Sequence, residues 1–201
     1  VKLGATIGFG GILLSNEYDV EANLGKMTFS APVTRIPANT FMSSTISTIS
    51  IPATVTEIGE SAFKYCLSLT SVTIPVSVTT IGDSAFYNCY SLTSVTIPDS
   101  VTSIGESAFR FCSSLTSFYG KFASEDNRCL IVDGKLIAFA PVGLTEYTIP
   151  DSINSIGDYT FYYCTSLTSV TIPDSVTTIG DEAFYDCRSP TSFYSKFASE
   201  E

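Results

Sequence analysis

A stretch of 23 residues, written several times along the chain, constrains the fold more than any other feature of this sequence. Ile51, Ile74 and Ile97 open three copies of the pattern IPxSVTxIGxxAFxxCxSLTSVT in direct succession, and Ile149 and Ile172 open two more. A fixed period of this length is typical of a solenoid, in which each repeat buries its apolar side against its neighbours. The sequence therefore predicts one elongated unit of stacked coils.

The same spacing divides the chain into a cap and a solenoid. We expect residues 1–28, which do not repeat, to form an N-terminal β-hairpin cap, and residues 29–201 to form the solenoid. A degenerate unit of 22 residues, 29–50, comes first, with Ser44 in the place of a recurring cysteine. The full repeats that follow are 51–73, 74–96, 97–119, 149–171 and 172–194, with an unusual unit, 120–148, between them.

Both ends of the sequence suggest a piece of a longer protein. The chain begins without Met, and VKLGATIGFGGILL lacks the pattern of a signal peptide, so we expect a trimmed or mature fragment. Residues 189–201 repeat the run that begins at Ser114, and Phe118 and Phe193 are 75 residues apart. We therefore expect a truncated C-terminus, beyond which another unit like 120–148 would follow.

Within one repeat, the apolar positions predict two extended segments and a short helical turn. Val72 and Ile74 alternate with polar residues, which indicates a strand with one exposed face that ends at Pro75. Val78 and Ile81 would point inward from a second extended segment, with Gly82 allowing a turn. The run DSAFYNC is predicted to form a helical turn that starts at Asp83 or Ser84 and buries Phe86 and Cys89.

The unit 120–148 is predicted to contain a β-hairpin. Arg128–Val132 and Lys135–Ala140 are apolar runs on either side of Asp133-Gly134. An Asp-Gly pair between such runs favours a two-residue turn with positive φ at both positions.

Composition excludes several classes of function. The net charge is −10, so the surface repels phosphate backbones, and we expect no nucleic-acid partner. No apolar run approaches the roughly 18 residues of a membrane span, so no transmembrane segment is expected. The chain contains no His, which removes Ser-His-Asp and Cys-His catalysis, and no phosphate-binding glycine loop is present. We expect neither an enzyme nor a cofactor.

Five of the six cysteines recur at one repeat position, and Cys129 lies in the hairpin. An even number in an extracellular protein would also fit disulfides. A residue that recurs once per coil stacks on its own copies about 5 Å apart, which favours a buried column of free thiols over bridges. Zinc is disfavoured because there is no CxxC and no His. The column consists of Cys66, Cys89, Cys112, Cys164 and Cys187.

An acidic residue follows the glycine of each repeat. A row of carboxylates could bind Ca²⁺, but no glycine-rich calcium loop accompanies it. We interpret each acid as the start of its helical turn, where the helix dipole favours negative charge. The row consists of Glu60, Asp83, Glu106, Asp158 and Asp181.

Two sets of exposed side chains are candidates for binding a partner. The strand face carries rows of Thr and Ser, and two tyrosines interrupt one of these rows at positions where an interface anchor would be expected. A stripe of aromatic residues beside the cysteine column forms the second set. The candidate binding residues are Thr73, Thr96, Tyr119, Thr171 and Tyr194 on the strands, and Tyr87, Tyr162 and Tyr185 in the stripe.

The repeat IPxSVTxIGxxAFxxCxSLTSVT resembles the BspA-like class of leucine-rich repeats, and the insert with RCLIVDGKLIAFAP resembles a unit known from that family. The resemblance implies a leucine-rich-repeat α/β solenoid: a right-handed coil of short strands and helical turns. Members are secreted or surface proteins of anaerobic bacteria associated with adhesion. It therefore implies a cell-surface or extracellular binding module, expected to be a monomer, whose partner is a host matrix or cell-surface protein.

Two other functions remain open. The chain could be a structural spacer that presents another domain and has no ligand of its own. Regular Ser/Thr rows could also bind ice, although Tyr119 and Tyr194 and the 29-residue insert argue against a long flat lattice.

Overall fold

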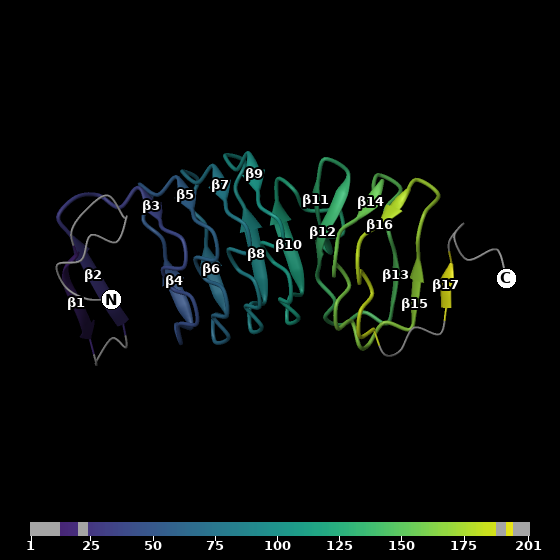
Figure 1. Ribbon diagram of the computed structural model, residues 1–201, viewed down its shortest axis with the longest axis horizontal. Coiled ribbons are helices and arrows are strands. Elements are labelled where there is room, and N and C mark those ends of the chain that lie inside the picture. The colour runs from purple at the N-terminus through teal and green to yellow at the C-terminus, as the bar shows by residue number, and fades with distance from the viewer. Residues whose placement is uncertain (1–12, 20–23, 188–191, 195–201) are drawn as a thin grey trace.

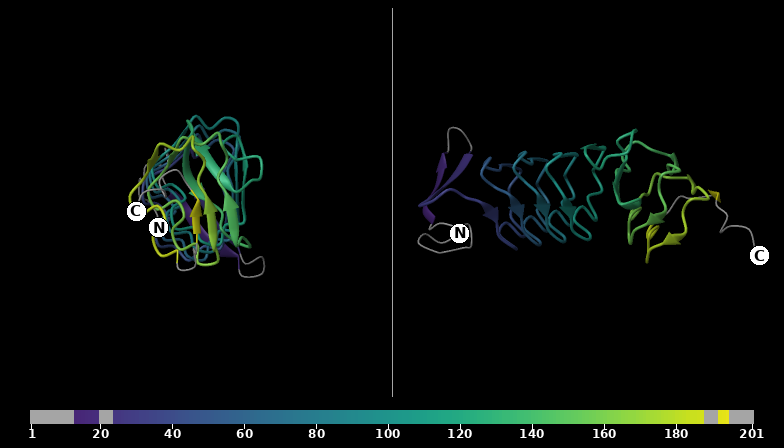
Figure 2. Two further views of the ribbon diagram at one scale, coloured as in Figure 1. Left: turned by 90° about the vertical axis from the view of Figure 1, so that its right-hand side faces the viewer. Right: turned by 90° about the horizontal axis from the view of Figure 1, so that it is seen from above.

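The protein is an elongated solenoid of stacked coils, with a β-hairpin at one end and the last strand at the other (Figures 1 and 2). The computed structural model describes residues 13–19, 24–187 and 192–194, and the side chains of residues 27–187. The hairpin consists of β1 (Leu13–Asp19) and β2 (Leu24–Phe29), which pair antiparallel. The rest of the predicted cap lies outside the described residues, and its capping role stays a prediction.

Each complete coil contributes two short strands, and strands of the same kind stack in parallel. The first strip holds β3 (Arg35–Ile36), β5 (Glu57–Ile58), β7 (Thr80–Ile81) and β9 (Ser103–Ile104), and it resumes beyond the insert with β14 (Ser155–Ile156) and β16 (Thr178–Ile179). The second holds β4 (Thr48–Ser50), β6 (Ser71–Thr73), β8 (Ser94–Ile97), β10 (Ser117–Gly120), β13 (Glu146–Thr148), β15 (Ser169–Thr171) and β17 (Ser192–Tyr194). Both predicted extended segments of the repeat are confirmed.

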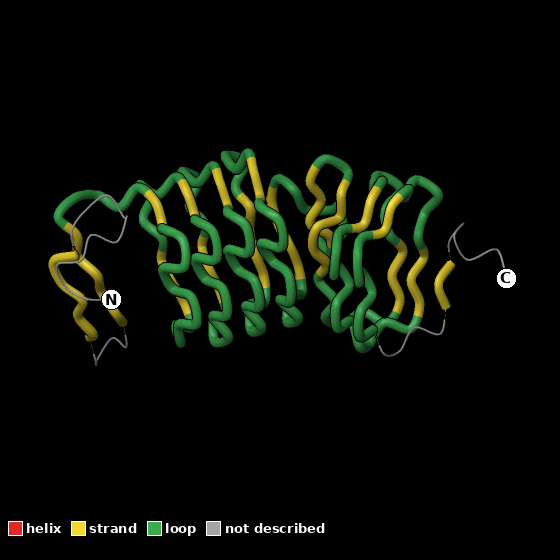
Figure 3. The backbone as a smooth tube through the Cα atoms, viewed as in Figure 1, coloured by secondary structure: helices red, strands yellow, loops and turns green. Residues whose placement is uncertain are grey.

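The predicted helical turns are wrong: no helix occurs in the described part of the chain (Figure 3). The run from Ser84 to Cys89 is a series of tight turns, which we call the turn segment, and Ser84 and Asn88 have φ values of 54° and 55°. Alternate N–H groups leave the coil and donate to the next one, as Phe86 N does to the Ala108 carbonyl at 2.8 Å. Because these donors serve the neighbouring coil, they cannot make the i→i−4 bonds of an α-helix.

The core is a set of stacked apolar columns. The inward phenylalanines of successive turn segments stack face to face, with ring centroids 5.1 Å apart between Phe63 and Phe86 and 5.2 Å apart between Phe86 and Phe109. Phe86 and Cys89 are fully buried, as predicted. This spacing follows the distance between coils, so each aromatic side chain packs on the equivalent one in the next coil.

Ser and Thr hydroxyls also join the coils. Thr79 Oγ1 donates to the Thr56 carbonyl at 3.1 Å, and Thr102 Oγ1 donates to the Thr79 carbonyl at the same distance. Ser77 and Ser100 form a second series, bonding to carbonyls of Val55 and Val78. These Ser and Thr hydroxyls therefore satisfy carbonyls of the preceding coil.

Gly82 lies just before the turns that begin at Asp83, as expected, and it also permits the close packing of coils. Its φ lies outside the left-handed region, and a Cβ added there would lie 2.6 Å from Glu60 N. The adjoining coil leaves no room for a side chain at this position of the repeat.

The insert contains the predicted hairpin, formed by β11 (Cys129–Val132) and β12 (Lys135–Phe139). Asp133 and Gly134 form the turn with φ values of 51° and 78°. β12 also pairs in parallel with β14, so it takes the place of a first-strip strand. Its side chains reach both hydrophobic clusters of the molecule, because Ala138 packs in the first and Leu136 and Phe139 pack in the second.

Candidate interaction surfaces

The strand face presents most of the side chains predicted to bind. Thr73 and Thr96 are exposed, Thr171 is half-buried, and the Tyr119 side chain is 46% exposed. Tyr119 pairs with Thr96 across β10 and β8. Tyr194 pairs with Thr171 through the backbone of β17, but its side chain lies outside the described residues. These residues share a face, and any binding role for them stays a prediction.

A ridge of aromatic side chains runs along the turn segments on another edge of the solenoid. Tyr87 meets Tyr65 edge to face at 5.6 Å and Phe111 at 4.9 Å, and Tyr162 stacks on Tyr185 at 5.8 Å. The structure therefore brings together the three predicted stripe residues, Tyr87, Tyr162 and Tyr185, through rings that follow one another coil by coil. We call this set the aromatic ridge; it comprises Tyr65, Tyr87, Phe111, Tyr159, Tyr162, Tyr163 and Tyr185.

Tyr159 belongs to the ridge and was missed by sequence reasoning. It occupies the left-handed position that Ser61, Ser84 and Ser107 hold in earlier coils, with a φ of 54°. A large aromatic residue in place of a recurring serine was the available signal. Hydrogen bonding to Glu182 raises the pKa of the Tyr159 hydroxyl, although Arg110 acts in the opposite direction.

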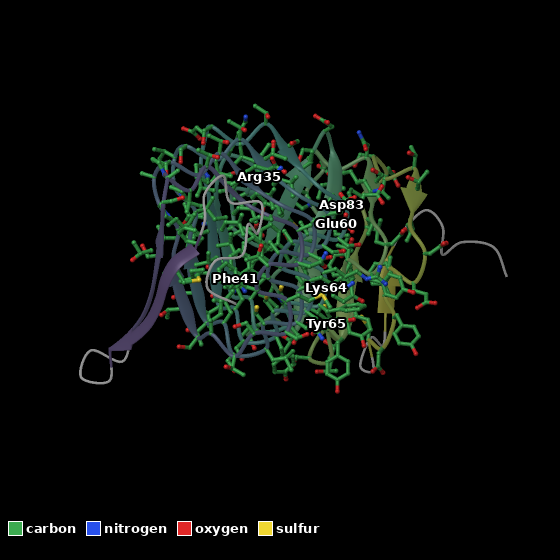
Figure 4. The ribbon with its side chains drawn as sticks, turned by 60° about the vertical axis from the view of Figure 1, so that its left-hand side comes forward. Arg35, Phe41, Glu60, Lys64, Tyr65 and Asp83 are labelled. Carbon is green, nitrogen blue, oxygen red and sulfur yellow. The ribbon has the colours of Figure 1, made fainter. Side chains whose placement is uncertain are left out.

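Two cations lie within the ridge. The Lys64 Nζ lies 4.7 Å from the centroid of the Tyr87 ring, and the Arg110 Cζ lies 3.2 Å from that of Tyr159 and 4.6 Å from that of Phe111. Figure 4 labels Lys64 and Tyr65, with Glu60 and Asp83 above them in that view. In the described part of the chain, neither cation forms an ion pair, so the aromatic rings are the groups that hold them.

The seam between residues 107–111 and 158–162 interrupts the backbone ladder of the turn segments. The insert has no turn segment of its own, and the Phe111 and Tyr162 rings meet directly at 4.0 Å. Within residues 24–187, the N–H groups of Ser107, Phe109 and Phe111 have no backbone acceptor, whereas the equivalent donors one coil earlier all bond to the next coil. The carbonyls of Asp158 and Thr160 likewise receive no backbone donor from the described residues.

A small cavity of about 20 Å³ lies in this seam. Arg110, Ser113, Asp158, Tyr159 and Tyr162 line it from the two coils, and Ile137–Phe139 of β12 line it from the hairpin. The Asp158 carboxylate accepts the N–H of Asp181 and forms no ion pair with Arg110. The Nε of Arg110 and the Oγ of Ser113 are buried and have no hydrogen-bond partner. The volume suffices for about one water molecule, so the cavity is a polar recess under the aromatic ridge.

Four cysteines of the column are buried as predicted and Cys187 is half-buried, and the thiols of all five are free. Cys66 Sγ lies 3.0 Å from the Phe41 carbonyl oxygen, and Cys89 Sγ lies 3.2 Å from that of Phe63. Burial, followed by the nearby Cys89, raises the pKa of Cys66 to about 11. Neutral buried thiols of this kind are small packing residues rather than nucleophiles, and no group of acidic and sulfur ligands suited to a metal occurs among the described residues.

The interpretation of the acidic row as helix caps is wrong, because there are no helices. Asp83 Oδ1 instead accepts the N–H of Glu106 in the next coil at 3.0 Å, and Asp158 Oδ1 accepts that of Asp181 at 2.9 Å. These two acids are bridges between coils.

The hairpin unit holds a polar cluster of its own. The Tyr147 hydroxyl donates to Asp126 Oδ2 at 2.9 Å and lies 3.1 Å from Cys129 Sγ. Burial raises the pKa of Tyr147, and burial likewise raises that of Cys129 to about 12. Arg128 Nη1 donates to the carbonyls of Thr116, Ala140 and Val142. The cluster is internally satisfied and fixes the hairpin to the coils.

Comparison with known proteins identifies the family. Six copies of the model described as BspA type leucine rich repeat region match residues 21–125 and 136–197, so the chain belongs to this family of leucine-rich repeat proteins. No curated protein matches the chain.

Solved structures similar to the chain include two bacterial proteins. A leucine rich cell surface protein from Faecalibacterium prausnitzii A2-165 is 32% identical, with a TM-score of 0.74 over 82% of this chain and 45% of the other. The pneumococcal vaccine antigen PcpA is 23% identical, with a TM-score of 0.68 over 81% of this chain and 42% of the other, and shows the fold alone. The chain spans less than half the length of either.

Among the described residues, none forms a helix that is long and apolar enough to cross a membrane.

Proposed function

We propose that this chain is a protein-binding module of a cell-surface or secreted protein, and that it adheres to host matrix or cell-surface proteins. Family membership and the similarity to the Faecalibacterium cell surface protein support this class of function. The fold also favours it, because a stack of coils presents long, ordered rows of side chains to a partner.

The observation that carries the proposal is the aromatic ridge. Tyr185 is 53% exposed, Tyr163 40% and Tyr65 38%, while their neighbours Tyr87 and Tyr162 are half-buried and hold the rings in order. Tyr and Arg are the residues that most often dominate binding energy at interfaces. Because contacts with neighbouring rings already restrict these side chains, binding would cost little further side-chain entropy.

The test is binding of the purified chain to a panel of immobilised extracellular matrix proteins, with ridge variants compared with a matched control. We expect Tyr162→Ala combined with Tyr185→Ala to weaken binding about tenfold or more. Tyr90→Ala is the control, because Tyr90 is 54% exposed and no ring contact involves it among the described residues. Equal binding by wild type and the double variant would refute the role of the ridge.

The strand face is tested in the same assay. Tyr119→Ala, and Tyr119→Ala with Tyr194→Ala, should leave binding nearly unchanged if the ridge is the contact surface. If only these variants lose binding, the contact surface is the strand face that carries Thr73, Thr96 and Thr171.

A structural spacer is the second candidate, and the bonds between coils favour it. Backbone donors, Ser and Thr hydroxyls and Asp83 all bond from one coil to the next. Such a rod would hold a neighbouring domain at a fixed distance without a ligand. Failure to bind any protein in the matrix panel, together with unchanged surface presentation of a fused domain in ridge variants, would favour the spacer.

A further inference from the structure

We propose that the seam under the aromatic ridge is a receptor for a carboxylate of a protein partner, with Arg110 as its central residue. This inference rests on the proposed protein-binding function and names the chemistry that the partner would bring to that surface. It concerns the part of the ridge between Phe111 and Tyr159.

The first step is the state of the Arg110 guanidinium. It stacks on Tyr159 and Phe111, which fix its plane, and its Nε is buried without a hydrogen-bond partner. No carboxylate of the described chain pairs with it, although acidic residues outnumber basic ones by 20 to 10 in the sequence. A partly desolvated cation without an ion-pair partner is unfavourable by itself, and a planar guanidinium can bind a carboxylate through two parallel hydrogen bonds.

The second step is the set of donors around it. Ser113 Oγ is also buried and unpartnered in the same cavity. The N–H groups of Phe109 and Phe111, which in other coils would donate to the next turn segment, have no backbone acceptor within the described residues. An acceptor group from outside would therefore meet several donors that the chain itself leaves unused.

The third step separates a peptide from an acidic sugar as the source of the carboxylate. On one side of the seam, alternate N–H groups of residues 107–111 have no backbone acceptor within the described residues. On the other side, the carbonyls of Asp158 and Thr160 have no backbone donor there. In every other pair of turn segments that the structure describes, this arrangement is filled by peptide backbone from the adjacent coil. The cavity between the two sides of the seam is too small for a peptide backbone. An Asp or Glu side chain of a protein can bring a carboxylate to Arg110 and these N–H groups while its neighbouring residues pack on the aromatic ridge, so a protein partner with an exposed Asp or Glu fits best.

The cavity of about 20 Å³ admits only a small group. The carboxylate therefore enters as the tip of a side chain, and the aromatic rings at the rim contact the rest of the partner. Displacement of about one water molecule would accompany its entry.

The experiment is an NMR titration of the full chain that follows the Arg110 Nε–H signal and the backbone amides of Phe109 and Phe111. The probe is the peptide acetyl-Ser-Glu-Ser-Glu-Ser-amide, compared with its Gln counterpart and with trigalacturonic acid at equal ionic strength. We expect saturable shifts of all three signals with the Glu peptide alone. Arg110→Gln should weaken the peptide about tenfold or more, whereas Lys64→Gln, which removes the other ridge cation, should not.

Each outcome decides the proposal. Equal shifts with the Glu and Gln peptides, or no shift beyond that of added sodium chloride, would overturn it. A stronger response to trigalacturonic acid would replace the peptide by an acidic sugar and so refute the assigned partner. The variants are first compared by thermal unfolding, and Arg110→Lys provides a folded variant that keeps the charge but loses the planar fork. If the chain binds no protein of the matrix panel but the titration with the Glu peptide is positive, adhesion to matrix proteins is refuted and the carboxylate site is not.

Discussion

Alkaline pH should destabilise this protein through its buried thiols, and Cys66 allows a direct measurement. Its side chain is fully buried, and its pKa rises from 9.0 in a free thiol to about 11 because of burial and the nearby Cys89. As pH rises above 9, the unfolded chain loses this proton while the folded chain keeps it. The contribution of the protonated thiol to stability is therefore complete below pH 9 and is lost as pH rises toward 11.

The size of the effect follows from the two pKa values. At about pH 10 the unfolded thiol is mostly ionised and the folded thiol is mostly protonated, which corresponds to a loss of about 1.4 kcal/mol in the free energy of unfolding. For a chain of this length, a loss of that size lowers the melting temperature by a few degrees, roughly 3–6 °C.

The assay is urea-induced unfolding under reducing conditions at about pH 7.5 and about pH 10, for wild type and Cys66→Ser. The serine hydroxyl can still donate to the Phe41 carbonyl but does not titrate in this range. The variant should therefore lose about 1 kcal/mol less than wild type between the two pH values. Equal losses would refute the reasoning, because they would mean that the folded state ionises this thiol as readily as the unfolded one or that the thiol is oxidised.

Three further substitutions test the contacts between coils, each by urea unfolding. Thr79→Val should cost about 1 kcal/mol, since the Thr56 carbonyl loses its hydroxyl donor. Thr73→Val is the control, because Thr73 is also exposed and its hydroxyl bonds to no other coil within the described residues. Gly82→Ala should destabilise the protein by roughly 1–3 kcal/mol or more, because the new Cβ would lie 2.6 Å from Glu60 N. In the comparison variant Gly143→Ala the new Cβ would meet no atom within 4 Å, so only the strain of an alanine at a φ of 81° remains, which costs about 1–2 kcal/mol. Ser84→Gly should stabilise by several tenths of a kcal/mol, because φ is 54° there. Stabilisation by Thr79→Val or Gly82→Ala, or destabilisation by Ser84→Gly, would contradict the described contacts and backbone conformation.

The fold was accessible from the sequence wherever a rule concerns single positions along the chain. The 23-residue period predicted the stacking, and the inward positions of Val78, Ile81, Phe86 and Cys89 followed from their recurrence. The Asp133-Gly134 turn was equally local, because positive φ at two successive residues suits few other pairs.

The turn segments could not be predicted from local rules. Residues 84–89 resemble a short helix in sequence because Phe86 and Cys89 are three residues apart. Whether their N–H groups bond within the coil or to the next coil depends on that neighbouring coil, whose acceptor carbonyls lie 22 residues further along the chain. The same neighbour determines that Asp83 bridges coils, as its Oδ1 does to Glu106 N, instead of capping a helix.

The candidate site was only partly predictable for a related reason. Tyr87, Tyr162 and Tyr185 were visible as a stripe, but Arg110 and Tyr159 lie 49 residues apart in sequence. They meet because the insert supplies a first-strip strand, β12, without supplying a turn segment. No pattern within a single repeat contains that information.

The regular coils and the seam therefore differ in what they leave available to a partner. Where one turn segment follows another, Phe86 N finds the Ala108 carbonyl and Asp83 finds Glu106 N, so those groups are satisfied within the chain. At the seam the same positions form no backbone bond to the following turn segment, and the chain places Arg110 and Tyr159 there in contact. A buried polar group without a partner is unfavourable for folding alone. Its presence where aromatic side chains gather is most simply explained if a partner supplies the missing acceptor, which is the outcome that the titration of Arg110 measures.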